Sequence, residues 1–219
     1  MKTAILIGAT GVTGKHVLEQ LLLRDEYTKI IVFVRRTVRV KDPRLHVHVV
    51  DFDAMDGWRD LIRGDDLFSA LGTTVKQAGG KAGQYKVDYQ YQADVIAAAA
   101  ANGVSRLFLV SSPQASPRSP IFYNRMKGRL DHFAAQQGFD TVVYFKPSII
   151  EGDRPDSRPG EKIGAVLVGA VAHWIPGASG LRPISGEQLA AAIVNCACSP
   201  LASGKHCYEL GEIFTLLDD

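Results

Sequence analysis

Tyr123 and Lys127 stand four residues apart in the segment YNRMK, at the head of a segment with helical periodicity. A spacing of four residues places both side chains on one face of a helix. A phenol hydroxyl can deliver a proton to an oxygen on which negative charge develops, and a nearby ammonium group favours the ionised phenol. The pair is therefore typical of acid–base chemistry at a carbonyl that accepts a hydride, with Tyr123 as proton donor and Lys127 as its activator.

Two serines, Ser111 and Ser112, precede this pair at the end of the predicted strand RLFLVSS, residues 106–112. Ligands of open α/β sheets bind at the carboxyl ends of the strands. A serine hydroxyl at this place can hold the oxygen of a substrate during the reaction.

Three glycines have the spacing of a turn that binds a diphosphate. Gly8, Gly11 and Gly14 make the pattern G-x-x-G-x-x-G between the apolar run 3–7 and an amphipathic segment. In such a turn one glycine permits a tight bend, another lets backbone amides approach a diphosphate, and the last lets a helix pack closely on a strand. The helix that follows presents free N–H groups and its positive dipole end to the phosphates. The pattern indicates that a dinucleotide binds here.

Arg35 and Arg36 follow the second predicted strand, residues 30–34, and no Asp or Glu stands beside them. An acidic residue at this place would bind the ribose 2′-hydroxyl of NAD, whereas guanidinium groups pair with a 2′-phosphate. We therefore predict NADP as the cofactor, with NADPH preferred over NADH. Asp51 and Phe52 end the third predicted strand, where they could meet the edge and the face of the adenine.

Apolar runs alternate with amphipathic segments along most of the chain. Uniformly apolar strands joined by helices predict an α/β fold, a doubly wound and mostly parallel Rossmann sheet. We predict one domain over residues 1–219, in which residues from about 150 to 219 form a small substrate-side extension with a core helix from Ile163. The predicted strands are 3–7, 30–34, 45–52, 66–72, 106–112, 141–147 and 206–210, and the predicted helices follow the glycine turn and cover 87–102, 124–137 and 187–198.

The net charge of the 219 residues is +2, from 25 basic and 23 acidic side chains. Binding to a nucleic acid backbone requires a concentrated positive surface, so we expect no nucleic acid partner. The longest apolar stretch has about 13 residues, whereas a bilayer-spanning helix needs about 20, so we expect no membrane partner. The three cysteines match no disulfide framework and the first residues do not resemble a secretory signal, so we expect a cytoplasmic protein.

Hydrolase and metal chemistry are not favoured. The chain has no G-x-S-x-G nucleophile elbow, and Asp131 and His132 adjoin, so that they point apart on a helix and are expected at the surface. The six histidines show no metal-ligand spacing, so we expect no metal site.

Two polar segments have open interpretations. The Gly- and Lys-rich segment 75–86 leaves the sheet edge where the cofactor should lie, and we predict a lid there, with an ordinary surface loop as the alternative. Arg154 and Arg158 could meet an acidic substrate or partner, and solvated arginines are the alternative.

The segments GATGVTG, LVSS and YNRMK occur in the order found in the short-chain dehydrogenase/reductase superfamily, which this chain resembles. More narrowly, it resembles the atypical branch that contains the Tat-interacting-protein-like oxidoreductases. The segments VVDF, LGTTVKQAGGKAGQYKVDY and KPSIIEGDRPDSRPGE carry this second resemblance. Together the similar segments cover most of the chain.

The resemblance implies a catalytic serine and a row of cofactor contacts. We prefer Ser112 as the catalytic serine, with Ser111 as the alternative, because the sequence does not show which hydroxyl faces the site. The implied contacts are Thr10, Gly11, Val12 and Thr13 at the diphosphate, Arg35 and Arg36 at the 2′-phosphate, Asp51 and Phe52 at the adenine, Leu71, Gly72 and Thr73 along the middle of the cofactor, and Pro147, Ser148 and Ile149 at the nicotinamide.

Two functions follow as predictions. The leading one is an NADP-dependent oxidoreductase that transfers a hydride to or from a small carbonyl or alcohol substrate. The alternative is a non-catalytic NADP-binding module that regulates a protein partner. The asparagine that completes the catalytic set in many members of the superfamily has no clear counterpart here, which favours the alternative, whereas the Ser, Tyr and Lys set favours the enzyme.

Overall fold

The computed structural model describes residues 1–151 and 182–217. Its centre is a seven-stranded sheet in the order β3-β2-β1-β4-β5-β6-β9, and every neighbouring pair is parallel. The predicted doubly wound parallel α/β sheet is confirmed. The strands are β1 (Lys2–Ile7), β2 (Tyr27–Val34), β3 (Leu45–Val49), β4 (Asp66–Ser69), β5 (Arg106–Val110), β6 (Thr141–Lys146) and β9 (Gly204–Glu209), and a separate parallel pair joins β7 (Ile150–Glu151) to β8 (Ile184–Ser185).

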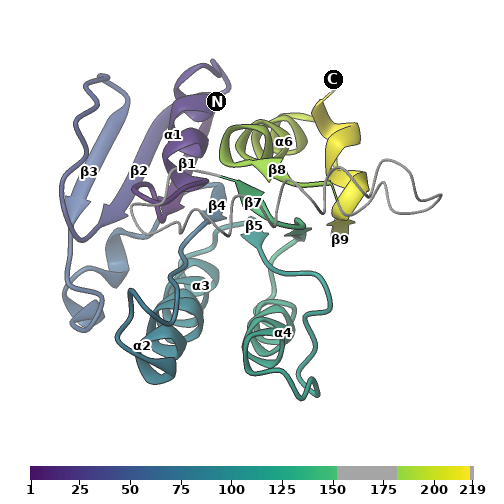
Figure 1. The fold of residues 1–219 in the computed structure, drawn as a ribbon. Coiled ribbons are helices and arrows are strands. Elements are labelled where there is room, and N and C mark those ends of the chain that lie inside the picture. The colour runs from purple at the N-terminus through teal and green to yellow at the C-terminus, as the bar shows by residue number, and fades with distance from the viewer. Residues whose placement is uncertain (152–181, 218–219) are drawn as a thin grey trace.

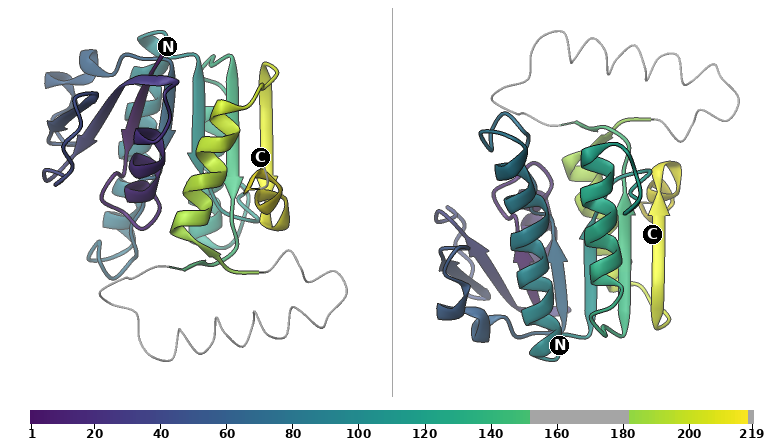
Figure 2. Two further views of the ribbon diagram at one scale, coloured as in Figure 1. Left: turned by 90° about the horizontal axis from the view of Figure 1, so that it is seen from above. Right: turned by 90° about the horizontal axis from the view of Figure 1, so that it is seen from below.

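Helices cover both faces of the sheet (Figures 1 and 2). Successive strand residues point to opposite faces, so Leu6 packs with α1 and α6 on one face while Ile5 and Ile7 pack with α3 and α4 on the other. Both faces are therefore apolar, as the uniformly apolar strands predicted. The α-helices are α1 (Gly14–Leu22), α2 (Lys81–Tyr85), α3 (Tyr91–Ala101), α4 (Phe122–Ala134) and α6 (Gly186–Cys198), with a π-helical turn at Lys86–Gln90 and 3₁₀ turns at Met55–Gly57, Arg59–Leu61 and Leu210–Leu217.

Among the differences from the predicted boundaries, two lie beside the glycine turn and the predicted cofactor contacts. The segment 75–86 is not a loop throughout, because α2 begins at Lys81 and continues through the π-helical turn into α3. The Gln84 side chain donates to the Thr73 carbonyl at 3.2 Å, and this tertiary contact holds a Gly-rich stretch in helical form. Strand β3 ends at Val49, so Asp51 and Phe52 lie in the turn that follows it. A lid function for the segment 75–86 stays a prediction.

Several predicted features lie outside the described residues. They are Arg154, Arg158, the core helix from Ile163 and the middle of the predicted extension from about 150 to 219. The described residues 182–217 place α6, β9 and the last 3₁₀ turn on the main sheet and its core. Within residues 1–151 and 182–217, no helix is both long and apolar enough to cross a membrane.

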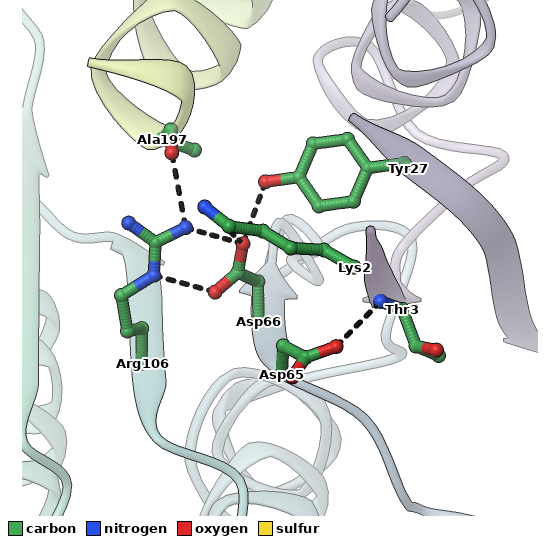
Figure 3. A network of polar contacts seen from close by, with 7 residues as sticks. All are labelled: Lys2, Thr3, Tyr27, Asp65, Asp66, Arg106 and Ala197. Carbon is green, nitrogen blue, oxygen red and sulfur yellow. Dashed lines mark hydrogen bonds and ion pairs between the residues drawn. The ribbon is translucent and has the colours of Figure 1, made fainter. Parts of the chain in front are cut away.

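A buried carboxylate ties four elements together at the amino-terminal edge of the sheet (Figure 3). Asp66, at the start of β4, is fully buried and accepts hydrogen bonds from Arg106 Nε at 2.6 Å and from the Tyr27 hydroxyl at 2.7 Å. Arg106 also donates to the Ala197 carbonyl of α6 at 3.0 Å, and Lys2 Nζ lies 3.9 Å from the same carboxylate. Burial and the neighbouring carboxylate raise the pKa of Tyr27 well above its usual range. The network fixes β2, β4, β5 and α6 at the edge opposite the glycine turn.

Replacing Arg106 should therefore destabilise the fold strongly. An Arg106→Met variant leaves the Asp66 carboxylate buried without its cation, and the free energy of unfolding should fall by about 3 to 5 kcal/mol in urea denaturation. Tyr27→Phe should cost about 1 kcal/mol, because it removes one hydrogen bond. Arg59→Met is the control, since Arg59 forms only an exposed pair with Asp56 at 3.5 Å. Equal stability of the Arg106→Met and Arg59→Met variants would contradict this account.

Candidate functional site

The glycine turn joins β1 to α1 at the carboxyl edge of the sheet. Gly8 has φ +89°, and a Cβ atom on it would lie 2.5 Å from the Ala70 carbonyl oxygen. A Cβ atom on Gly14 would lie 2.0 Å from the Gly8 carbonyl oxygen. No side chain fits at such distances, so only glycine lets β1, α1 and the end of β4 approach this closely. The amino end of α1 thereby comes to the space above β1 and β4.

A cleft of about 740 Å³ opens where the strand order reverses between β1 and β4. Open parallel sheets bind ligands at such a point. The lining comes from the glycine turn, the ends of β2, β4 and β5, and α4. The predicted site residues that line it are Gly8, Thr10, Gly11, Val12, Thr13, Arg35, Arg36, Phe52, Leu71, Gly72, Thr73, Tyr123 and Lys127.

Lys15, Arg35 and Arg36 border the cleft, in addition to Lys127 of α4. Lys15 lies in the first turn of α1, where it is exposed and also lines the cleft. Phosphate groups need positive charge and backbone donors in one place, which these side chains and the glycine turn supply. The donor set therefore fits a phosphorylated dinucleotide.

Helix α4 carries the predicted acid–base pair. Tyr123 and Lys127 occupy its first turns and both line the cleft. Lys127 is only 3% exposed, and its Nζ donates to the Val110 carbonyl at 2.8 Å, whereas Tyr123 is 38% exposed. The ammonium group of Lys127 is thus buried against the end of β5, whereas Tyr123 lies at the more exposed part of the cleft.

The serine that lines the cleft is Ser111, and Ser112 does not line it. The two residues follow β5 directly, and successive residues of an extended chain point in opposite directions. The Ser112 hydroxyl donates to the Pro113 carbonyl at 3.2 Å instead. Ser111, the alternative, is thus the one of the two that lines the cleft, and the identity of the catalytic serine stays a prediction.

Five further predicted residues do not line the cleft: Gly14, Asp51, Pro147, Ser148 and Ile149. Gly14 acts by its close packing on the turn, and the Asp51 carboxylate accepts the backbone N–H of Asp53 at 2.9 Å. Ser148 donates its hydroxyl to the Arg182 carbonyl, while Ile150 takes the place on the cleft wall. Cofactor contacts of these residues stay predictions.

Sequence reasoning missed Asp88, which lies in the π-helical turn and lines the cleft at 2% exposure. Its Oδ2 accepts the Thr73 backbone N–H at 2.9 Å. Burial raises the pKa of Asp88 to about 6, although the Lys127 charge and the Thr73 hydrogen bond oppose this shift. π-Helical turns often mark functional sites, and a perturbed carboxyl in a cleft points the same way. The only signal in the sequence is one acidic residue in a segment that continues into an Ala-rich helix.

Asp131 was predicted at the surface, and this prediction is wrong. Its side chain is 15% exposed, and its Oδ2 accepts the Ser111 hydroxyl at 2.9 Å. Its neighbour His132 is exposed, as two adjacent helix residues pointing apart require. Within the described ranges, no group of three or more His, Cys, Asp or Glu side chains could hold a metal ion.

A family model described as NAD(P)H-binding matches residues 8–142, from the glycine turn to β6. The chain belongs to this NAD(P)H-binding family. Among its curated relatives, the mitochondrial protein FMP52 of Meyerozyma guilliermondii is 34% identical over 204 residues, 91% of this chain and 87% of that protein. Protein HTATIP2 of Rattus norvegicus is 30% identical over 181 residues, 80% of this chain and 74% of that protein. The resemblance to the Tat-interacting-protein-like branch is confirmed.

Solved structures show the same fold around this NAD(P)H-binding region. The enzyme WbmH of Bordetella bronchiseptica, in complex with NAD⁺, has a TM-score of 0.71 at 18% identity and covers 100% of this chain and 80% of its own. MoeE5, in complex with UDP-glucose and NAD, has a TM-score of 0.70 at 15% identity over 97% of this chain and 80% of its own. At such identities the likeness shows the fold alone.

The prediction of a cytoplasmic location is contradicted by the names of the relatives. Several fungal proteins that match this NAD(P)H-binding protein, from Meyerozyma guilliermondii, Aspergillus terreus and Aspergillus niger, are designated mitochondrial. The prediction relied on unpaired cysteines and the lack of a secretory signal, and neither feature distinguishes one reducing compartment from another.

The Asp88 carboxyl should make stability depend on pH. Its pKa in the folded protein is about 6 against 3.8 as the ordinary value, so the folded state binds more protons than the unfolded state between these values. Stability should therefore fall by about 2 kcal/mol as pH rises from 4 to 7. An Asp88→Asn variant should lose this slope in urea denaturation and be more stable than wild type at pH 8. Asp56→Asn, at an almost fully exposed carboxylate, should keep the wild-type slope. An unchanged slope in Asp88→Asn would disprove the assignment.

Proposed function

We propose that this NAD(P)H-binding protein is an NADP-dependent oxidoreductase that transfers a hydride to or from a small carbonyl or alcohol substrate. One observation carries the proposal: a single cleft brings together the glycine turn, Arg35 and Arg36, and the pair Tyr123 and Lys127. The first two groups fit a phosphorylated dinucleotide, and the third fits proton transfer to a substrate oxygen. In this proposal the part of the chain from about 150 to 219 supplies the substrate side.

The residues of the cleft divide the work. Backbone N–H groups of the glycine turn hold the diphosphate, Arg35 and Arg36 hold the 2′-phosphate, and Phe52 borders the adenine. NADPH, when bound, supplies the hydride. Tyr123 donates its phenol proton to the carbonyl oxygen as negative charge develops there, and the ammonium group of Lys127 stabilises the phenolate that remains.

A second candidate is a non-catalytic NADP-binding module. One contact favours it: Lys127 Nζ donates to the Val110 carbonyl at 2.8 Å, so one donor of the ammonium group is already bound to the backbone of the protein. In such a module the cleft would bind the cofactor and signal its presence to a protein partner. Both candidates share the cofactor site, so turnover alone separates them.

Arg35 and Arg36 should decide cofactor preference. The double variant Arg35→Ala and Arg36→Ala should weaken NADPH binding about 10- to 100-fold, because each charge-assisted contact to the phosphate is lost. NADH binding should change less than twofold, so that the preference for NADPH disappears in fluorescence titrations. Arg39→Ala, an exposed arginine outside the cleft lining, is the matched control. Equal loss of NADPH and NADH affinity would disprove a 2′-phosphate role.

Tyr123→Phe should separate the enzyme from the module. The variant keeps the ring and loses the proton donor, so NADPH oxidation with a panel of small carbonyl compounds should slow about 10²- to 10⁴-fold while NADPH affinity stays within twofold. Tight NADPH binding by the wild type with no turnover of any compound would favour the module instead. No measurable affinity for NADPH or NADH would overturn both candidates.

A further inference from the structure

A hydrogen bond joins Ser111, which lines the cleft, to Asp131 of α4. Tyr123, Lys127 and Asp131 follow one another at intervals of four residues along α4, so they share one face of the helix. Ser111 lines the cleft, and its hydroxyl donates to Asp131 Oδ2 at 2.9 Å. A hydroxyl has one proton, so the lone pairs of Ser111 Oγ are left to accept a hydrogen bond from another group.

Asp131 also lines a second cavity. Asp131, Gly128 and Tyr144 help to line a cavity of about 340 Å³ between α4 and the strands β6 and β9. Asp131 Oδ1 is buried, and no hydrogen-bond partner for it is found in the described part of the chain. Buried carboxylate oxygens normally have partners, and this one borders a cavity with room for water, which can supply the missing hydrogen bond.

The groups around Asp131 act on its pKa in both directions. Burial raises the pKa of Asp131, and the Ser111 hydrogen bond and the charges of Lys127 and Lys146 act in the opposite direction. Glu209 raises it further. The titratable groups around it are Lys127 and His132 on α4, Tyr144 and Lys146 on β6, and Lys205, His206, Cys207 and Glu209 on β9. Burial and Glu209 thus favour the protonated carboxyl, whereas the Ser111 hydrogen bond and the two lysines favour the carboxylate.

We propose that Ser111 and Asp131 form a proton path between the cleft and the second cavity, with Asp131 as a positioning residue that orients the Ser111 hydroxyl. This inference rests on the proposed function. In the reducing direction, Tyr123 gives its proton to the substrate oxygen and is left as phenolate. Ser111 then passes its hydroxyl proton to Tyr123 and receives one from the Asp131 carboxyl, which is protonated again by water in the cavity. No electrons move along the path, and each oxygen ends as it began.

The test compares three variants with NADPH and 9,10-phenanthrenequinone as the probe carbonyl. Asp131→Asn keeps an acceptor oxygen for Ser111 but cannot carry a proton. Its turnover should fall at least tenfold. We expect wild-type turnover to decrease with rising pH as Asp131 loses its proton, and this decrease should disappear in Asp131→Asn. NADPH affinity should stay within twofold. Ser111→Ala should behave in the same way, and Ser111→Thr, which restores the hydroxyl, should recover turnover. Asp94→Asn, a carboxylate on α3 outside both cavities, is the control.

A second readout does not depend on turnover. Infrared difference spectra of wild type against Asp131→Asn report the titration of the Asp131 carboxyl. Ser111→Ala should move this titration to higher pH, because it removes the hydrogen bond that favours the charged form. An unmoved titration overturns the path, whether or not the probe is turned over, and so does an unchanged pH profile in Asp131→Asn. Absence of NADPH binding would overturn the proposed function instead, while the titration would still decide whether Ser111 and Asp131 are coupled.

Discussion

The close approach of three backbone segments is the constraint on which the cleft depends. The turn after β1, the start of α1 and the end of β4 meet at Gly8 and Gly14, where a Cβ atom would lie 2.5 Å or less from backbone atoms. Because no side chain intervenes, the turn and the amino end of α1 border one space at the point where the strand order reverses. Lys15, Arg35 and Arg36 border the same space, so positive charge is concentrated where a dinucleotide places its phosphates.

The two ends of the parallel strands differ in how many partners their carboxyl groups have. At the amino-terminal edge, the Asp66 carboxylate has Arg106 and Tyr27 as direct partners, and the network joins strands to α6 (Figure 3). At the carboxyl edge, Asp88 is buried and the Asp131 side chain is 15% exposed, each carboxyl has fewer partners, and burial raises the pKa of both. A buried carboxyl without a full set of partners lowers stability, and carboxyls with a perturbed pKa are concentrated at functional sites of proteins.

Helix α4 connects these features in space. Its exposed start places Tyr123 at the mouth of the cleft, its next turn holds Lys127 beneath the floor, and the turn after that places Asp131 between the cleft and the second cavity. A rigid helix fixes the spacing of the three groups, and Ser111 at the end of β5 completes the set from the adjoining strand. Proton transfer requires such fixed distances, which a loop would not maintain.

The sequence by itself determined the class of fold, the glycine turn, the arginine pair and the spacing of Tyr123 and Lys127. Each of these depends on local periodicity or on a pattern of neighbouring residues, and such patterns can be recognised from the sequence alone. Only the tertiary structure decided that Ser111 rather than Ser112 lines the cleft, that the Asp131 side chain is only 15% exposed, and that Asp88 lines the cleft. These three facts depend on how α3 and α4 pack against the sheet, because burial and hydrogen-bond partners come from residues far away in the chain.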